Sequence, residues 1–138
     1  DLSLGLNIEL KPAPGTDAQT ARAVAATIES TKQAILVSSF SHAALGAFHA
    51  SAPGIPLGAL YRAVPRDVDL RRLTVPVHTI HTAARELTRA DVERLTAAGF
   101  RVLSYVVNDA DRGQQLSSWG VAAVFTDFPE RFAGRSAA

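Results

Sequence analysis

Short apolar segments alternate along this chain with longer segments whose apolar residues recur at helical spacing. Residues 21–28, for example, place apolar side chains at i, i+3, i+4 and i+7, which is one face of a helix. The apolar segments predict strands at residues 7–12, 35–40, 56–61, 75–81, 101–107 and 121–126. No hairpin turn joins two of these strands. The alternation therefore predicts an α/β fold, with a parallel sheet and helices outside it.

Helix boundaries are also encoded in the sequence. Side chains able to cap a helix stand before three helical segments: Thr16 or Asp17, Ser41, and Asn108 or Asp109. Two capping boxes are predicted, one from Thr88 with Asp91 and one from Asp127 with Glu130. Gly99 marks a helix end, because glycine readily adopts the left-handed conformation found there.

Polar residues gather at the carboxyl ends of the predicted strands. They are Glu9, Lys11, Ser38, Ser39, Thr79, His81, Tyr105, Asn108, Thr126 and Asp127. In a βα barrel the functional groups lie at these strand ends, although polar residues there also serve as helix caps. No G-x-G-x-x-G follows a strand and no P-loop occurs, which disfavours the nucleotide-binding open sheets.

The segment Asn7–Pro12 carries the strongest candidate chemistry. Alternation along a strand puts Glu9 and Lys11 on one face and Ile8 and Leu10 on the other. A carboxylate and an ammonium that face inward need pairing, hydration or a metal ion. Two interpretations stay open from these residues alone, an edge strand with a solvated ion pair or a ligand site.

Composition narrows the classes of function. The 138 residues suit one domain, and 47% hydrophobic and 20% charged residues are ordinary for a globular protein. The formal charge of +1 does not indicate the strongly basic surface that binds nucleic acid. No apolar run is long enough to span a membrane. Cysteine is absent, which excludes disulfides and thiolate metal sites.

The start of the chain is unusual for a complete protein. The sequence contains no methionine and reaches a predicted strand within a few residues of Asp1. We therefore expect this chain to be a fragment of a longer protein.

Four motifs in order carry a resemblance to a known family. They are Asn-Ile-Glu-Leu-Lys-Pro at 7–12, Val-Ser-Ser-Phe at 37–40, Tyr-Val-Val-Asn-Asp at 105–109, and Gly-Val-Ala-Ala-Val-Phe-Thr-Asp-Phe-Pro at 120–129. Together they resemble the glycerophosphodiester phosphodiesterase family over essentially the whole chain, and most closely its short cytosolic bacterial form. The resemblance implies the C-terminal portion of a TIM-type (β/α) barrel, incomplete and with about six βα strands. Residues 1–138 would be part of one barrel domain, with residues 133–138 as a flexible tail.

The resemblance also implies an activity and roles for residues. The family hydrolyses glycerophosphodiesters to an alcohol and glycerol 3-phosphate with a divalent cation, Ca²⁺ or Mg²⁺. By resemblance Glu9 is a metal ligand, Lys11 contacts the phosphate and Tyr105 lines the substrate pocket, with an aromatic of the barrel interior as the alternative for Tyr105. Phe40 is predicted to belong to the core or to the wall of the substrate pocket. Tyr105 stands where the family commonly has Trp, and Val106 replaces a frequent Thr. A cytoplasmic enzyme of lipid and glycerol metabolism is implied.

The chain also departs from the family pattern. The family's His-Arg-Gly, its paired Glu and Asp metal ligands and its second histidine have no counterpart here. The histidines present are His42, His49, His78 and His81, and none stands in such a motif. We therefore expect the acid-base histidines and the other metal ligands upstream, and an inactive fragment that does not hold the metal alone.

A second hypothesis follows from these missing residues. The chain would then be a non-catalytic part-barrel that acts in assembly or binding. Because an incomplete barrel leaves open sheet edges, we expect self-association or pairing with the missing N-terminal part.

Overall fold

The computed structural model describes residues 4–132, which form two compact units. Unit 1 consists of residues 4–60 and 67–78, and unit 2 of residues 61–66 and 79–132. The predicted tail at 133–138 lies outside the described residues. The assignment of residues 1–138 to part of one barrel domain stays a prediction.

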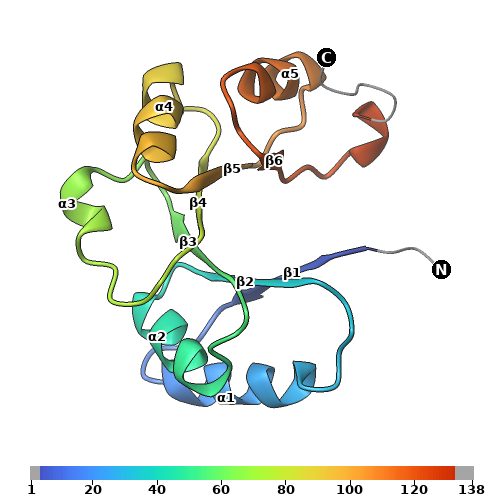
Figure 1. The fold of residues 1–138 in the computed structure, drawn as a ribbon. Coiled ribbons are helices and arrows are strands. Elements are labelled where there is room, and N and C mark those ends of the chain that lie inside the picture. Colours follow the sequence, from blue (N-terminus) through green and yellow to red (C-terminus); the bar gives the residue numbers. More distant parts are fainter. Residues whose placement is uncertain (1–3, 133–138) are drawn as a thin grey trace. The chain divides into compact units, whose positions relative to one another are not determined.

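Unit 1 is built from parallel strands and the helices that follow them (Figure 1). Its elements are β1 (Leu6–Leu10), α1 (Asp17–Ile28), β2 (Ile35–Ser39), α2 (His42–Ser51), β3 (Leu57–Tyr61, whose last residue belongs to unit 2) and α3 (Asp67–Leu70). Strand β2 pairs in parallel with both β1 and β3. The predicted alternation of strands and helices is confirmed in this unit.

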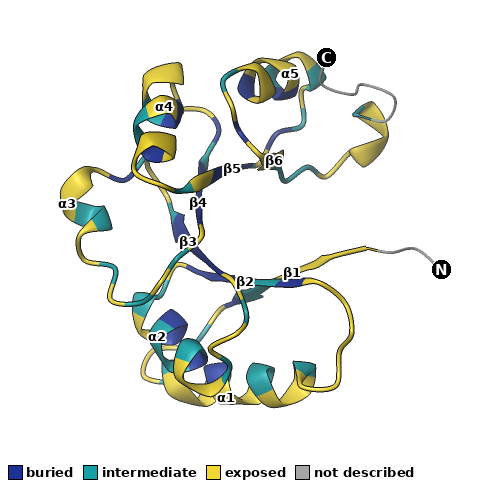
Figure 2. Ribbon diagram, in the orientation of Figure 1, coloured by how far each residue is buried: buried dark blue, intermediate teal, exposed yellow. Residues whose placement is uncertain are grey.

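The β1–β2 pair has two chemically different faces. Leu10, Val37 and Ser39 are fully or almost fully buried on the side of α1 and α2, and we call this the helix face. Asn7, Glu9 and Ser38 alternate with them and form the opposite face. Helix α2 buries Ala44, Leu45 and Phe48, and Figure 2 shows it as a mixture of buried, intermediate and exposed residues.

Unit 2 repeats the pattern. Its elements are β4 (Thr79–Ala83), α4 (Arg89–Ala97), β5 (Arg101–Tyr105), α5 (Ala110–Ser118), β6 (Ala123–Val124) and the 3₁₀ helix η1 (Pro129–Arg131). Strand β5 pairs in parallel with β4 and β6. Val92 and Leu95 of α4 are fully buried, as is Val102 of β5, which fits a helix packed on its sheet.

Helix boundaries follow the capping residues closely. The capping box of Thr88 and Asp91 is confirmed, because each side chain accepts the other residue's backbone N–H, at 3.1 and 3.2 Å. Ser41 caps α2 by accepting from the N–H of Ala44. Gly99 follows α4 with φ of +93°, the conformation expected of a helix stop.

Several boundary predictions were wrong. Thr16 is the N-cap of α1, but no side chain caps that helix, and the strand expected at 121–126 is only Ala123–Val124. The strand expected at 75–81 runs instead from Thr79 to Ala83, after Pro76, a residue that cannot donate to a strand ladder. The N–H of His78 donates to the Leu57 carbonyl at 2.8 Å, and the N–H of Leu57 donates to His78 Nδ1 at 3.3 Å. The capping box at Asp127 and Glu130 is absent, since Phe128 is the N-cap of η1 and no side chain caps it.

None of the helices in residues 4–132 has the length and apolar character that crossing a membrane requires.

Candidate functional site

Glu9 and Lys11 stand at the carboxyl end of β1. Glu9 lies on the opposite face of the β1–β2 pair, level with Ser38. Lys11 Nζ lies 3.6 Å from Glu9 Oε2, with side-chain exposures of 76% for Lys11 and 28% for Glu9. The ion pair left open by the sequence is therefore present, in a place where an incoming anion can reach the ammonium.

A hydrogen-bond chain fixes the strand end between these two residues. Ser39 Oγ donates to the carbonyl of Leu10 at 2.8 Å and accepts from the N–H of Ser41 at 3.0 Å. Ser41 Oγ in turn donates to the carboxylate of Asp17, in the first turn of α1. The chain joins β1, β2 and the starts of both helices, so the backbone that carries Glu9 and Lys11 is anchored.

Only part of this anchoring is visible in the sequence. Ser39 is a polar residue at a predicted strand end, but its partner Leu10 lies 29 positions away. A hydroxyl on the otherwise apolar helix face was the available clue, since a buried polar group needs a partner.

Phe40 and Tyr105, the expected pocket residues, belong to different units. Phe40 comes directly after β2 and is 38% exposed. Tyr105 ends β5 and is half-buried, and its hydroxyl donates to the carbonyl of Tyr61 at 2.6 Å. Their roles as substrate-contacting residues stay predictions.

His81 is the buried histidine of unit 2. It is fully buried, its Nε2 lies 2.8 Å from Thr79 Oγ1, and its ring centre lies 5.4 Å from that of Phe125. Its Nδ1 has no hydrogen-bond partner among the described residues. Desolvation by burial lowers the pKa of His81 from 6.5 to about 4, so the ring is uncharged at neutral pH.

Side chains tie together the loops that follow β5 and β6. Asn108 Nδ2 donates to Asp127 at 2.9 Å, while Asn108 Oδ1 accepts from the N–H of Asp127 and from the hydroxyl of Thr126. Arg131 donates to the Asn108 carbonyl at 3.0 Å. Asn108 thus joins two loops, and Asp109 is the residue that caps α5.

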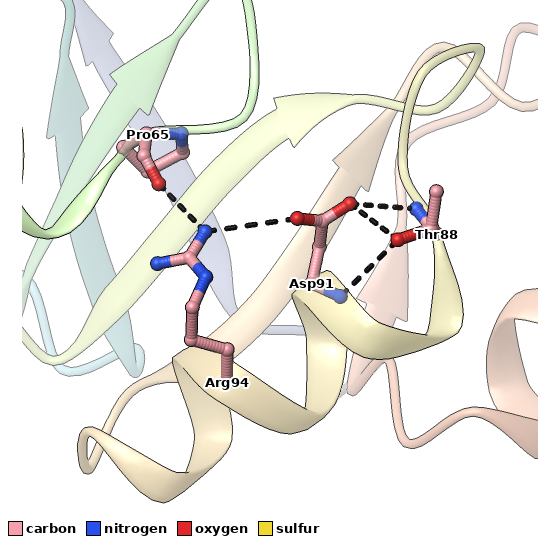
Figure 3. Close-up of polar contacts among 4 residues, drawn as sticks. All are labelled: Pro65, Thr88, Asp91 and Arg94. Carbon is pink, nitrogen blue, oxygen red and sulfur yellow. Dashed lines mark hydrogen bonds and ion pairs between the residues drawn. The ribbon is translucent and has the colours of Figure 1, made fainter.

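Two arginines hold the other strand-end loops of unit 2. Arg112 donates to the carbonyls of Ala84 and Leu87, at 2.7 and 2.9 Å. Arg94 donates to the Pro65 carbonyl at 2.8 Å and lies 3.7 Å from Asp91 of the capping box (Figure 3). Nothing in the local sequence pattern marks these arginines, since the carbonyls that they bind lie more than twenty positions away.

Glu9 is the carboxylate that β1 offers to a cation at this site. Residues 4–132 contain no group of three or more His, Cys, Asp or Glu side chains arranged to hold a metal ion. Ca²⁺ takes six to eight oxygen ligands and Mg²⁺ six. Glu9 fits the chemistry of such a cation as one ligand of a larger set.

Comparison with known proteins identifies the group to which the chain is similar. Residues 6–131 match the model of the glycerophosphoryl diester phosphodiesterase family. A glycerophosphodiester phosphodiesterase of Bacillus altitudinis is 32% identical over 99 residues, which cover 70% of this chain and 40% of that protein.

Solved structures agree with this match. A phosphodiesterase of Oleispira antarctica, in complex with its product sn-glycerol 3-phosphate, is 30% identical with a TM-score of 0.87, over 94% of this chain and 53% of that one. A glycerophosphodiester phosphodiesterase of Thermotoga maritima, 21% identical with a TM-score of 0.68, shares the fold over 91% of this chain and 55% of its own. The chain thus spans about half the length of these relatives.

The predicted α/β fold, an incomplete TIM-type barrel with about six βα strands, is confirmed by the strand pairings and by the Oleispira structure. The expected family is confirmed by the match over residues 6–131. The chain belongs to the glycerophosphoryl diester phosphodiesterase family.

Proposed function

We propose that this chain contributes the phosphate-binding part of an active site that hydrolyses glycerophosphodiesters to an alcohol and glycerol 3-phosphate. The observation that carries the proposal is the placement of Glu9 and Lys11 at the carboxyl end of β1, 3.6 Å apart. Membership of the family and the glycerol 3-phosphate bound to the Oleispira relative support the substrate class.

Lys11 suits the role of phosphate contact. An ammonium stabilises the negative charge of a bound phosphodiester. It also stabilises the additional negative charge that develops as the P–O bond breaks. Its side chain is 76% exposed, so a ligand reaches it without displacing a packed group. The anchored carbonyl of Leu10 limits movement of the backbone from which Lys11 extends.

Glu9 suits the role of metal ligand, for Ca²⁺ or Mg²⁺. Such a cation, when bound, polarises a phosphoryl oxygen. Glu9 would hold it with one carboxylate, and the remaining ligands would come from outside the described residues. In this proposal the fragment alone is inactive, because we expect the acid-base histidines that the family resemblance implies to lie outside these 138 residues.

In this proposal His81 is not the general acid. Burial lowers its pKa to about 4, so the ring is uncharged at neutral pH and the acidic imidazolium form is scarce. The cytoplasmic location, the place in lipid and glycerol metabolism, and the alternative role in assembly stay predictions.

Substitution in the full-length protein tests the proposal. Glu9→Gln and Lys11→Met should each lower kcat/KM for glycerophosphodiester hydrolysis by at least about a hundredfold at saturating cation. Glu29→Gln and Lys32→Met alter an exposed carboxylate and an exposed ammonium elsewhere in unit 1 and are the matched controls. Activities of Glu9→Gln and Lys11→Met within a few-fold of the wild type would show that the assignment is wrong.

A further inference from the structure

Ser38 carries a buried hydroxyl that is not satisfied. Its side chain is fully buried, and its Oγ has no hydrogen-bond partner among the residues that the structure describes. Its neighbour Ser39 is equally buried but makes two hydrogen bonds, to Leu10 and Ser41. An unpaired buried hydroxyl costs free energy, so an alanine would be the more stable choice at position 38 unless the hydroxyl serves a ligand.

The strand register places this hydroxyl beside the proposed site. Ser38 is the register partner of Glu9 across the β1–β2 pair. Neighbouring strands lie about 4.8 Å apart, and paired residues of parallel strands project to the same face. On the other side its partner in β3 is Gly58, which has no side chain. Glu9 is therefore the only side chain level with Ser38 on the two adjoining strands.

We propose that the Ser38 hydroxyl is a ligand contact that donates a hydrogen bond to an anionic phosphate oxygen at the Glu9–Lys11 site. The inference rests on the proposed function and adds a residue to its binding site. A hydroxyl kept away from water and left without a protein partner is suited to an anionic acceptor, because hydrogen bonds to charged groups are the stronger ones. Glu9 pairs with Lys11 and leaves the Ser38 donor unused.

The experiment measures binding and stability on the same variants of the full-length protein. The probe is sn-glycerol 3-phosphate, titrated calorimetrically at a fixed saturating concentration of Ca²⁺ or Mg²⁺, and Tm is recorded for each variant. Ser38→Ala removes the donor and Ser38→Thr keeps it. Ser104→Ala is the matched control, since Ser104 is a fully buried serine that donates to the carbonyl of Thr82.

The inference predicts opposite patterns for the two alanine variants. Ser38→Ala should weaken binding about tenfold, which corresponds to about 1.4 kcal/mol, with Tm unchanged or raised. Ser38→Thr should bind within about threefold of the wild type, as expected of a charge-assisted bond that is kept. Ser104→Ala should lower Tm by about 5 °C and bind as the wild type does.

Other results overturn the inference in distinguishable ways. If Ser38→Ala binds like the wild type while Glu9→Gln and Lys11→Met bind weakly, Ser38 is not a contact and the proposed function stands. A fall in Tm with unchanged binding would show that the hydroxyl is structural. If the wild type does not bind the probe, or if Glu9→Gln and Lys11→Met bind and hydrolyse normally, the proposed function and this inference both fail.

Discussion

The two faces of the β1–β2 pair differ in how completely their polar groups are hydrogen-bonded. On the helix face Leu10 and Val37 are buried, and the one hydroxyl, that of Ser39, has its hydrogen bonds satisfied. On the opposite face Glu9 and Lys11 make a single ion pair of 3.6 Å and Ser38 lacks a partner. Residues that are adjacent in sequence thus belong alternately to a packed core and to a face whose polar groups are incompletely satisfied.

This difference separates stability from binding within one five-residue strand. A core position is expected to be fully packed and fully hydrogen-bonded. A ligand site keeps polar groups whose best partners arrive with the ligand. Changes on the helix face should therefore alter the free energy of unfolding, and changes on the opposite face should alter affinity and rate.

The largest expected effect on stability is on the helix face. Leu10→Ala should lower the free energy of unfolding by about 3.5 kcal/mol, because it removes a side chain that is only 2% exposed and leaves a cavity. Urea denaturation of the full-length protein measures it. Leu4→Ala, at a position that is 60% exposed, is the control and should change stability by less than about 0.5 kcal/mol. If Glu9→Gln destabilises the protein as much as Leu10→Ala does, the contrast between the faces fails.

A comparable effect, dependent on pH, is expected from His81 in unit 2. The unfolded chain binds a proton with a pKa near 6.5, whereas burial lowers the pKa in the folded state to about 4. Between these values the unfolded state holds more protons, so stability falls as the pH falls, by up to about 3 kcal/mol in total. Denaturation curves between pH 7 and pH 4 measure this loss.

His81→Gln should remove most of that pH dependence, whatever its stability at pH 7. His49→Gln is the matched control for the loss of a histidine from the chain. If the free energy of unfolding of the His81→Gln protein falls between pH 7 and pH 4 as much as that of the wild type, a group other than His81 causes the pH dependence.

The smallest expected effect distinguishes Ser39 from its neighbour. Ser39→Ala should lower the free energy of unfolding by about 1.5 kcal/mol, because it leaves a buried carbonyl and a backbone N–H without their partner. Ser51→Ala, which removes an exposed hydroxyl at the end of α2, is the control. Should Ser38→Ala cost more stability than Ser39→Ala, the account of an unused hydroxyl at Ser38 would be wrong.

Periodicity predicted local structure well because local structure depends on residues close in sequence. Alternation in 7–12 correctly separated Glu9 from Leu10, and the Thr88–Asp91 capping box spans four residues. The strand expected at 75–81 was misplaced, and it lies at Thr79–Ala83. Residue 76, between Val75 and Val77, is a proline, which cannot donate to a strand ladder, and the prediction followed the valines and not this proline.

Residues of the candidate site could be predicted only where they belong to a short sequence motif. Glu9 and Lys11 come from one hexapeptide, so the pattern places them together. The hydrogen bonds of Ser39, Asn108 and Arg112 join segments 18 to 29 positions apart, and sequence reasoning about neighbours does not reach them. The burial of His81 likewise results from tertiary packing, including its contact with Phe125.

The most direct test of the ligand face is a structure of the full-length protein with sn-glycerol 3-phosphate and a divalent cation. The account predicts phosphate oxygens within about 3 Å of Lys11 Nζ and Ser38 Oγ, and the cation bound to the Glu9 carboxylate. A phosphate bound elsewhere, with the Glu9–Lys11 ion pair unchanged and Ser38 still unpaired, would contradict it.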